Sequence, residues 1–189
     1  MNGRDTAVLP RESPVYDPIT RGVHWLNAIL ALMVIFLAWA MLGMPRHSNA
    51  RGWLIMLHAS LGIIILGVML FWAGWRVRHG SPPLRPLLTA VEAMLARATQ
   101  AGIFVLFVAM PISGYVGLAA AGKSVALFGL VNIPLLTPES DRLSQAAVAL
   151  HLTGEFLIYG LVALHVAAAL RHGFIRRDGI LERMLPRRG

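Results

Sequence analysis

Four long apolar segments constrain this chain of 189 residues more than any other feature. They run from about residue 23 to 43, 53 to 75, 98 to 120 and 145 to 170. A helix needs about 20 apolar residues to cross roughly 30 Å of hydrocarbon, so each segment is long enough to span a membrane. Charged residues make up only 14% of the chain, against about a quarter in soluble domains. The sequence therefore predicts an all-α membrane protein, a four-transmembrane-helix bundle that forms a single domain over residues 1–189.

The basic residues predict how this bundle is oriented. Lys and Arg number 17 against nine acids, a net charge of +8, and they flank the apolar segments. This placement favours a role in membrane orientation over binding of nucleic acid. The amino-terminal arm, the second loop and the carboxyl-terminal tail carry 13 of them, and the other two loops carry four. Because cytoplasmic loops are enriched in Lys and Arg, both termini are expected in the cytoplasm.

Two polar regions are expected to lie outside the helices. Residues 1–20 are broken by three prolines and predict a cytosolic arm, and residues 80–86 are rich in Gly and Pro and predict a linker. The chain contains no cysteine. Disulfides, thiolate-bound clusters and covalent c-type haem are therefore excluded.

Four histidines fall inside the apolar segments: His24, His58, His151 and His165. Ionisable side chains are rare inside membrane helices and usually belong to functional sites, although a neutral histidine can also bind a neighbouring helix by hydrogen bonding. The remaining three, in loops or at a segment boundary, are expected to be ordinary exposed or interfacial side chains. His151 and His165 are 14 residues apart, close to four helical turns, so both leave the same helix face roughly 21 Å apart along the axis.

The predicted orientation pairs these histidines by depth. His24 and His165 lie a few residues inside basic residues on the cytoplasmic side. His58 and His151 lie similarly inside basic residues on the periplasmic side. We therefore expect His24 to face His165, and His58 to face His151.

Two histidines at each level favour haem over zinc. Zinc requires three or four protein ligands, and only one acid, Glu155, lies inside a segment. Haem iron needs only two axial ligands from the protein, which predicts two non-covalent haem b groups. Gly62 and Gly154, each close to a histidine, are expected to make room for a flat ring. With both axial positions filled, the chemistry implied is outer-sphere electron transfer. Candidate partners of the haem propionates are Arg21, Lys123, Arg142 and Arg171.

Several ordered motifs resemble those of the bacterial cytochrome b561 family, whose members are di-haem b-type membrane cytochromes. The motifs cover nearly the whole chain: Tyr16–Trp25, His58–Gly62, Pro111–Tyr115, Phe128–Leu130, His151–Gly154, His165–His172 and Arg177–Pro186. The resemblance implies a multi-pass protein of the bacterial inner membrane whose four histidines hold the haem irons. It also implies electron exchange with ubiquinone or menaquinone. In characterised members, the periplasmic haem can accept an electron from superoxide, and the cytoplasmic haem is the expected place for quinone.

The chain departs from the family pattern at three positions. Gln100 stands where the family usually has a histidine, Phe104 where it has a tyrosine, and Trp72 near a usual arginine. These changes leave axial ligation untouched and affect contacts to propionate or quinone.

For a superoxide donor, a basic residue near the periplasmic haem would attract the anion. Lys123 is the first candidate for this role, followed by Arg51 and Arg142. Two other functions stay open at this point. The chain is also compatible with a cytochrome b anchor subunit of a dehydrogenase or hydrogenase, or with a haem-free transporter or scaffold that uses its histidines as proton relays.

Overall fold

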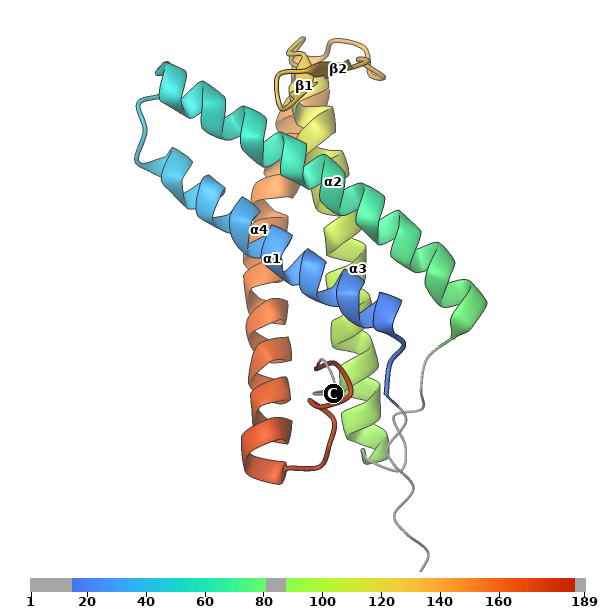
Figure 1. The fold of residues 1–189 in the computed structure, drawn as a ribbon. Helices are drawn as coiled ribbons and strands as arrows, with labels where there is room; N and C mark the ends of the chain where they lie inside the picture. Colours follow the sequence, from blue (N-terminus) through green and yellow to red (C-terminus); the bar gives the residue numbers. More distant parts are fainter. Residues whose placement is uncertain (1–14, 81–87, 186–189) are drawn as a thin grey trace, which may run out of the picture.

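A computed structural model describes residues 15–80 and 88–185 of the chain, and within them four long helices dominate the fold (Figure 1). The elements are α1 (Pro18–Leu42), α2 (Asn49–His79), α3 (Ala90–Ala119), β1 (Val125–Leu127), β2 (Val131–Ile133), α4 (Asp141–Leu170) and the short π-helix η1 (Arg171–Arg176). All four long helices are apolar enough to cross a membrane. The predicted four-helix membrane bundle is confirmed. The predicted linker from residue 81 onward and most of the predicted amino-terminal arm lie outside the described residues, as do Arg4, Arg11, Arg85, Arg187 and Arg188.

The helices form two antiparallel pairs. α3 and α4 run side by side along the bundle, and α1 and α2 form a second pair that crosses them obliquely (Figure 1). Leu30 of α1 packs against Leu61, Ile65 and Met69 of α2 in the main buried apolar cluster. The α1–α2 pair contacts the other pair mainly through α2 and α3.

Each long helix begins several residues before the apolar segment predicted from the sequence. α1 begins at Pro18, a residue expected to break the amino-terminal arm, because proline is well tolerated in the first helical turn, where its missing N–H needs no partner. The side chain of Asp17 caps this helix by accepting hydrogen bonds from Thr20, and the indole of Trp75 in α2 donates to it at 3.2 Å. Burial alone would raise the pKa of Asp17, but these hydrogen bonds outweigh burial and hold the pKa below its usual value.

The third predicted segment contains Pro111, and α3 is nevertheless continuous from Ala90 to Ala119. At its start, Thr89 and Glu92 form a capping box, in which each side chain accepts a hydrogen bond from the backbone N–H of the other. This capped first turn therefore precedes the apolar residues that predict the span.

A small hairpin forms in the long loop between α3 and α4, which the sequence predicted only as a loop. β1 pairs antiparallel with β2, and the turn between them places Phe128 and Gly129 in the left-handed region, with φ of 50° and 74°. The buried hydroxyl of Ser60 in α2 accepts a hydrogen bond from the backbone N–H of Phe128 at 2.8 Å. The hairpin thus packs against α2 two residues beyond His58.

The opposite end of the bundle holds the described parts of both chain ends. The backbone N–H of Tyr16 donates to the carbonyl of Arg183 at 3.3 Å, and the indole of Trp25 donates to the carbonyl of Met184 at 2.9 Å. These contacts place the two ends on the same side of the bundle, as an even number of spans requires. We refer to this end as the terminal end and to the other as the hairpin end.

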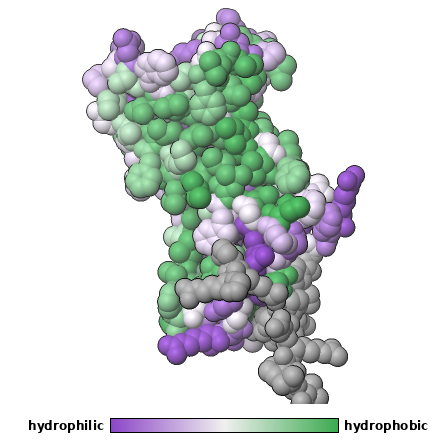
Figure 2. All heavy atoms as spheres, in the orientation of Figure 1, coloured by the Kyte–Doolittle hydropathy of each residue, from purple (hydrophilic) through white to green (hydrophobic). Residues whose placement is uncertain are grey.

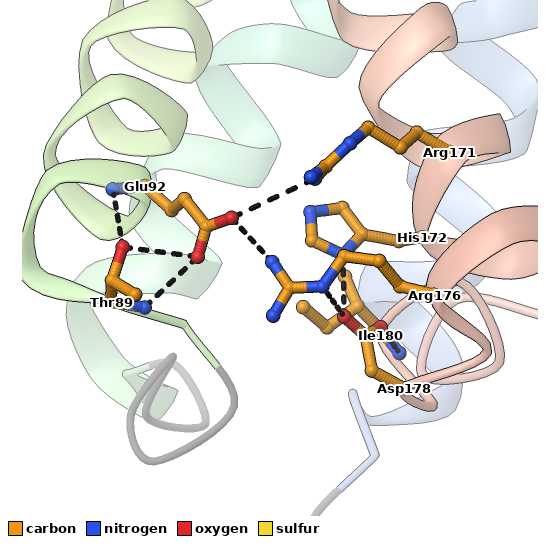
Figure 3. A network of polar contacts seen from close by, with 7 residues as sticks. All are labelled: Thr89, Glu92, Arg171, His172, Arg176, Asp178 and Ile180. Atoms are coloured by element: carbon orange, nitrogen blue, oxygen red, sulfur yellow. Dashed lines mark hydrogen bonds and ion pairs between the residues drawn. The ribbon is translucent and has the colours of Figure 1, made fainter.

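An ionic network holds the carboxyl-terminal segment at the terminal end (Figure 3). Glu92 at the start of α3 pairs with Arg171, at 3.6 Å, and with Arg176. Asp178 binds Arg176 and the imidazole of the buried His172, the latter at 2.6 Å. His172 is therefore a buried side chain that binds a carboxylate at the terminal end, whereas the sequence predicted an ordinary interfacial imidazole.

The surface of the bundle is apolar between its two ends. Figure 2 shows hydrophobic residues covering the middle of the visible face, with hydrophilic residues towards both ends. Large apolar side chains such as Phe36 and Phe156 are exposed rather than packed in a core. This distribution is that of a protein surrounded by lipid.

Candidate functional site

The four histidines inside the helices lie in two pairs. The ring centroids of His24 in α1 and His165 in α4 are 6.0 Å apart, with an angle of 61° between the rings. The ring centroids of His58 in α2 and His151 in α4 are also 6.0 Å apart, at 72°. These are the two pairs expected from depth along the sequence, although ligation of a metal by them stays a prediction.

The backbones that carry each pair stand apart. No Cα atom of α4 lies within 8 Å of a Cα atom of α1 or α2, although α4 packs closely on α3, and α1 on α2. The paired imidazoles therefore face one another across the boundary between the two helix pairs. A flat ring bound between facing imidazoles needs such a separation of the helices.

The spacing of the imidazoles fits two axial ligands of one iron. Imidazole nitrogens bind first-row metals at about 2 Å, and the ring centroid lies roughly 1 Å behind the nitrogen, so two ligands on opposite sides of an iron have centroids about 6 Å apart. The observed distance is 6.0 Å in both pairs. Within residues 15–80 and 88–185, no three His, Asp or Glu side chains gather at one point. Each pair thus offers two ligands, the number that haem requires.

Hydrogen bonds to backbone carbonyls fix the tautomer of His58 and His151. Nδ1 of His58 lies 3.0 Å from the carbonyl oxygen of Val34, and Nδ1 of His151 lies 2.9 Å from that of Met110. A carbonyl only accepts, so each Nδ1 carries the proton and donates it. Nε2 is left unprotonated in the neutral ring and free to bind a metal. Such donation also orients the ring and increases the basicity of the binding nitrogen.

Gly114 of α3 provides the space for the His151 ring, a role that the sequence analysis did not assign. A Cβ atom at position 114 would lie 3.1 Å from Cε1 and 3.2 Å from Nδ1 of His151. By contrast, the two glycines expected to make room for a flat ring face α3. A Cβ atom at Gly62 would meet Pro111, and one at Gly154 would meet Met110. The place of Gly114 in the motif Pro111–Tyr115 was the sequence signal that could have pointed to this role.

The substitution Gly114→Ala is expected to weaken haem binding at the His58–His151 pair about tenfold or more, because changes that disturb the support of a metal ligand typically cost that much. The added methyl group would displace a ring that two hydrogen-bonded groups, Met110 and Ser113, hold in place. Haem content after gel filtration measures the effect. Gly67→Ala is the matched control, since a Cβ atom there meets nothing within 4 Å. Equal haem retention in both variants would contradict this role of Gly114.

Polar atoms without a partner lie close to His24. The Nε of Arg21, three residues before His24, and the Oδ1 of Asn27, three residues after it, are buried without a hydrogen-bond partner. A terminal nitrogen of Arg21 donates to the carbonyl of Leu185 at 2.9 Å. Buried unpaired groups are costly in a folded protein. Their presence one turn from His24 fits a bound group with polar substituents, and Arg21 fits the expected role of a propionate partner.

The other basic residues proposed from the sequence differ in their surroundings. Arg51 binds the carbonyls of Met41 and Met44 at the end of α1, and Arg171 pairs with Glu92, so both have structural partners. Lys123 and Arg142 are exposed at the hairpin end. Both are therefore accessible to an approaching anion, as the role expected of Lys123 requires.

The three departures from the family pattern lie on or near α2 and α3. Trp72 stacks obliquely on Phe104, with ring centroids 5.5 Å apart, and the guanidinium of Arg76 lies 5.5 Å from the Trp72 ring. An arginine is thus present one turn beyond the position where the family usually has one. Gln100 is exposed on α3.

Besides the two histidine pairs, a further set of polar side chains lies inside the membrane part of the bundle. The hydroxyl of Tyr159 donates to Glu155, both in α4, and the indole Nε1 of Trp39 in α1 donates to the Tyr159 hydroxyl at 3.0 Å. The sequence singled out Glu155 as an acid inside a segment but assigned it no role. Tyr159 lies one turn from Glu155 in the same helix, but the contact of Tyr159 with Trp39 was not predictable, because these two residues are 120 positions apart in the chain.

Comparison with known proteins identifies the relatives of this chain. The profile of the prokaryotic cytochrome b561 family matches residues 15–187. A protein of Yersinia pestis named probable superoxide oxidase CybB is 31% identical over 175 residues, which cover 92% of this chain and 97% of that protein. Cytochrome b561 homolog 2 of Escherichia coli K12 is 31% identical over 173 residues, 90% of each chain. Cytochrome b561 homolog 1 of the same organism is 28% identical over 167 residues, 88% of this chain and 94% of that protein.

Proposed function

This chain belongs to the prokaryotic cytochrome b561 family, and from this membership we propose that it moves single electrons between a periplasmic donor and membrane quinone. The family assignment makes the chain a multi-pass protein of the bacterial inner membrane that transfers electrons and carries b-type haem. We further propose that the number of haems is two. His24 and His165 would hold one haem b, and His58 and His151 the other.

The equal 6.0 Å spacing of the two imidazole pairs is the observation that carries this proposal. Haem b, when bound between such a pair, supplies a one-electron iron couple with no open coordination position. The protein contributes ligand orientation through the carbonyls of Val34 and Met110, which accept hydrogen bonds from His58 and His151. The four imidazoles are half-buried in the protein, and the lipid around the bundle would keep water from them.

The charge distribution supports an orientation with both termini in the cytoplasm. The described basic residues concentrate towards the terminal end, and by the positive-inside rule this favours a periplasmic hairpin end. The His58–His151 pair lies near the hairpin, since Ser60 binds the hairpin turn. This pair is therefore the one nearer a periplasmic donor, and the His24–His165 pair is nearer the cytoplasm.

Superoxide is the donor that we propose, because one relative of this chain is named a probable superoxide oxidase. The exposed Lys123 at the hairpin end supports this choice, since a positive charge attracts an approaching anion. Oxidation of superoxide to dioxygen releases one electron, which matches a one-electron carrier. The acceptor that we propose is ubiquinone or menaquinone.

Stopped-flow mixing of the purified haem-loaded protein with superoxide, with and without a short-chain quinone, tests this function. We expect the reduced α-band to appear on mixing with superoxide and to decay faster when quinone is present. If superoxide produces no reduced band, the proposed donor is wrong. If the reduced protein is not reoxidised by ubiquinone or menaquinone analogues, the proposed acceptor is wrong.

The substitution Lys123→Glu is expected to slow superoxide-driven haem reduction several-fold at low salt, with the difference shrinking as ionic strength rises. A local charge reversal replaces attraction of the anion with repulsion, and salt screens both. The measurement is the second-order rate constant of reduction at two salt concentrations. Arg97→Glu, on an exposed residue of α3 towards the terminal end, is the control with the same change in net charge. An unchanged rate in Lys123→Glu, or an equal decrease in the control, would remove Lys123 from this role.

A further inference from the structure

A carboxyl, a phenol and an indole form a hydrogen-bonded set whose two members on α4 lie between His151 and His165, and none of the three is among the proposed haem ligands. We propose that this set, Glu155 and Tyr159 of α4 with Trp39 of α1, binds the headgroup of membrane quinone and quinol. This inference rests on the proposed function, which requires a quinone, and it moves the site from the cytoplasmic haem, where the family resemblance implied it, to the region between the two histidine pairs. We call the three residues the interlevel set.

The hydrogen bonds of the interlevel set run in one direction. Trp39 Nε1 donates to the hydroxyl of Tyr159 at 3.0 Å, and that hydroxyl donates to Oε1 of Glu155. The rings of Trp39 and Tyr159 meet edge to face, with centroids 6.1 Å apart. The set joins α1 to α4, whose Cα atoms all lie more than 8 Å apart. It is therefore a polar bridge between helices that do not pack on one another.

The depth of the set places it near both histidine pairs. Glu155 follows His151 by four residues, and Tyr159 precedes His165 by six. At a rise of about 1.5 Å per residue, these separations are roughly 6 and 9 Å along the helix axis. A headgroup bound at the interlevel set would lie between the two proposed haem levels, at a short distance from each.

A carboxyl at this depth calls for a functional explanation. In the described parts of the four long helices, the other acids, Glu92 and Asp141, lie in first helical turns, where an acid interacts favourably with the helix dipole. Glu155 lies in the middle of α4, where an ionisable group is costly and usually serves transport, binding or catalysis. Amide or hydroxyl side chains could bridge two helices without that cost.

The set can be reached from the lipid. Glu155 and Tyr159 are only partly buried, Trp39 is 52% exposed, and the neighbouring Phe156 is 73% exposed. In a membrane, such exposed apolar surface faces the acyl chains. A quinone dissolved in the bilayer would therefore approach Glu155 sideways, past aromatic rings suited to packing against its flat headgroup. Phe156 and Tyr159 already make an edge-to-face contact, with centroids 6.3 Å apart.

The chemistry of the three groups matches both redox forms of such a ligand. A quinone presents two carbonyl acceptors. The indole of Trp39 and the phenol of Tyr159 donate to Tyr159 and Glu155, and on binding they would exchange these bonds for bonds to the quinone carbonyls. A quinol presents two hydroxyl donors, and the carboxylate of Glu155 is an acceptor. One site with donors and an acceptor side by side can thus hold the headgroup before and after its conversion.

Equilibrium binding of a short-chain benzoquinone and a short-chain naphthoquinone to the oxidised, haem-loaded protein tests the site. We expect Glu155→Gln and Tyr159→Phe each to weaken binding of at least one quinone about tenfold, as loss of a hydrogen bond to a charged or buried group does. Haem content and the reduced spectrum should stay as in the unsubstituted protein. The matched controls lie at the hairpin end, one in the last turns of α3 and one in the loop before α4. They are Glu139→Gln, which removes an exposed acid, and Tyr115→Phe, which removes a phenol that donates to the carbonyl of Pro134 at 2.5 Å.

The outcomes separate this inference from the proposed function. If the unsubstituted protein binds quinone and both variants bind within twofold of it, the interlevel set is not the site, while the proposed function stands. If the unsubstituted protein neither binds quinone nor is reoxidised by it, both are wrong. Should Glu155→Gln fail to retain haem, Tyr159→Phe alone decides, since its ring still packs against Trp39. Weakened binding in the Glu139 and Tyr115 controls to the same extent would also overturn the assignment.

Discussion

The substitutions His58→Ala and His151→Ala are each expected to reduce the haem content from two to one per chain and to abolish rapid reduction by superoxide. Each would remove one of the two proposed iron ligands of the pair nearer the hairpin end, and the remaining imidazole alone would hold haem weakly. The rings of the other pair would keep their geometry, because they lie about four helical turns away along α4. The measurements are haem per chain from the absorption spectrum and the stopped-flow rate with superoxide.

A histidine outside the bundle provides the control for this prediction. His47→Ala removes an exposed imidazole from the loop between α1 and α2 and should retain both haems and the full rate. Retention of two haems in His58→Ala or His151→Ala would show that these side chains are not ligands.

The second large effect is expected at the other pair, where His24→Ala and His165→Ala should also leave one haem per chain but preserve reduction by superoxide. The pair lies near the terminal end, so its loss removes a haem distant from the site where the donor approaches. We expect the rate of superoxide-driven reduction to stay within about twofold of the unsubstituted protein, because the exposed surface around Lys123 is unchanged. The spectrum should lose the band of one haem and keep that of the other.

Comparing the rates of superoxide-driven reduction in the two sets of variants shows which proposed haem lies on the donor side of the membrane. If all four variants lost the reaction with superoxide equally, the donor side would not be at the hairpin end. If His24→Ala and His165→Ala lost the reaction while His58→Ala and His151→Ala kept it, the proposed orientation would be reversed.

The spans and the pairing of the histidines were predictable because they follow from short-range patterns. Apolar residues must cover a helix in lipid, which identifies the four segments from composition alone. The depth of His24 or His151 within a segment follows from the number of residues to the nearest boundary charge. The structure brings the expected rings to 6.0 Å of each other, and ligation of haem by them is still a prediction.

Helix starts were less predictable than spans. The polar residues Asp17 and Thr89 cap α1 and α3 outside the apolar segments, so the helices begin before the hydropathy signal does. Pro18 illustrates the difficulty, since proline breaks a helix interior but is favoured at a helix start.

Features made by contacts between distant parts of the chain were not predicted. Gly114 leaves space for the His151 ring, whereas Gly62 and Gly154, chosen for their proximity to histidines in sequence, face α3. The hydrogen bond from Trp39 to Tyr159 depends on how α1 crosses α4. Helix crossing depends on side-chain packing over the whole interface, which periodicity along one segment does not specify.

The haem stoichiometry of the purified protein is the most direct test of the account. Haem extracted from a known amount of chain, together with the reduced-minus-oxidised spectrum, gives both the type and the number of haems. We expect about two non-covalent haem b groups per chain, with the sharp α-bands of iron held by two imidazoles. A folded chain that is colourless, or that binds a single haem at saturation, would contradict the assignment of His24 with His165 and of His58 with His151 as two ligand pairs.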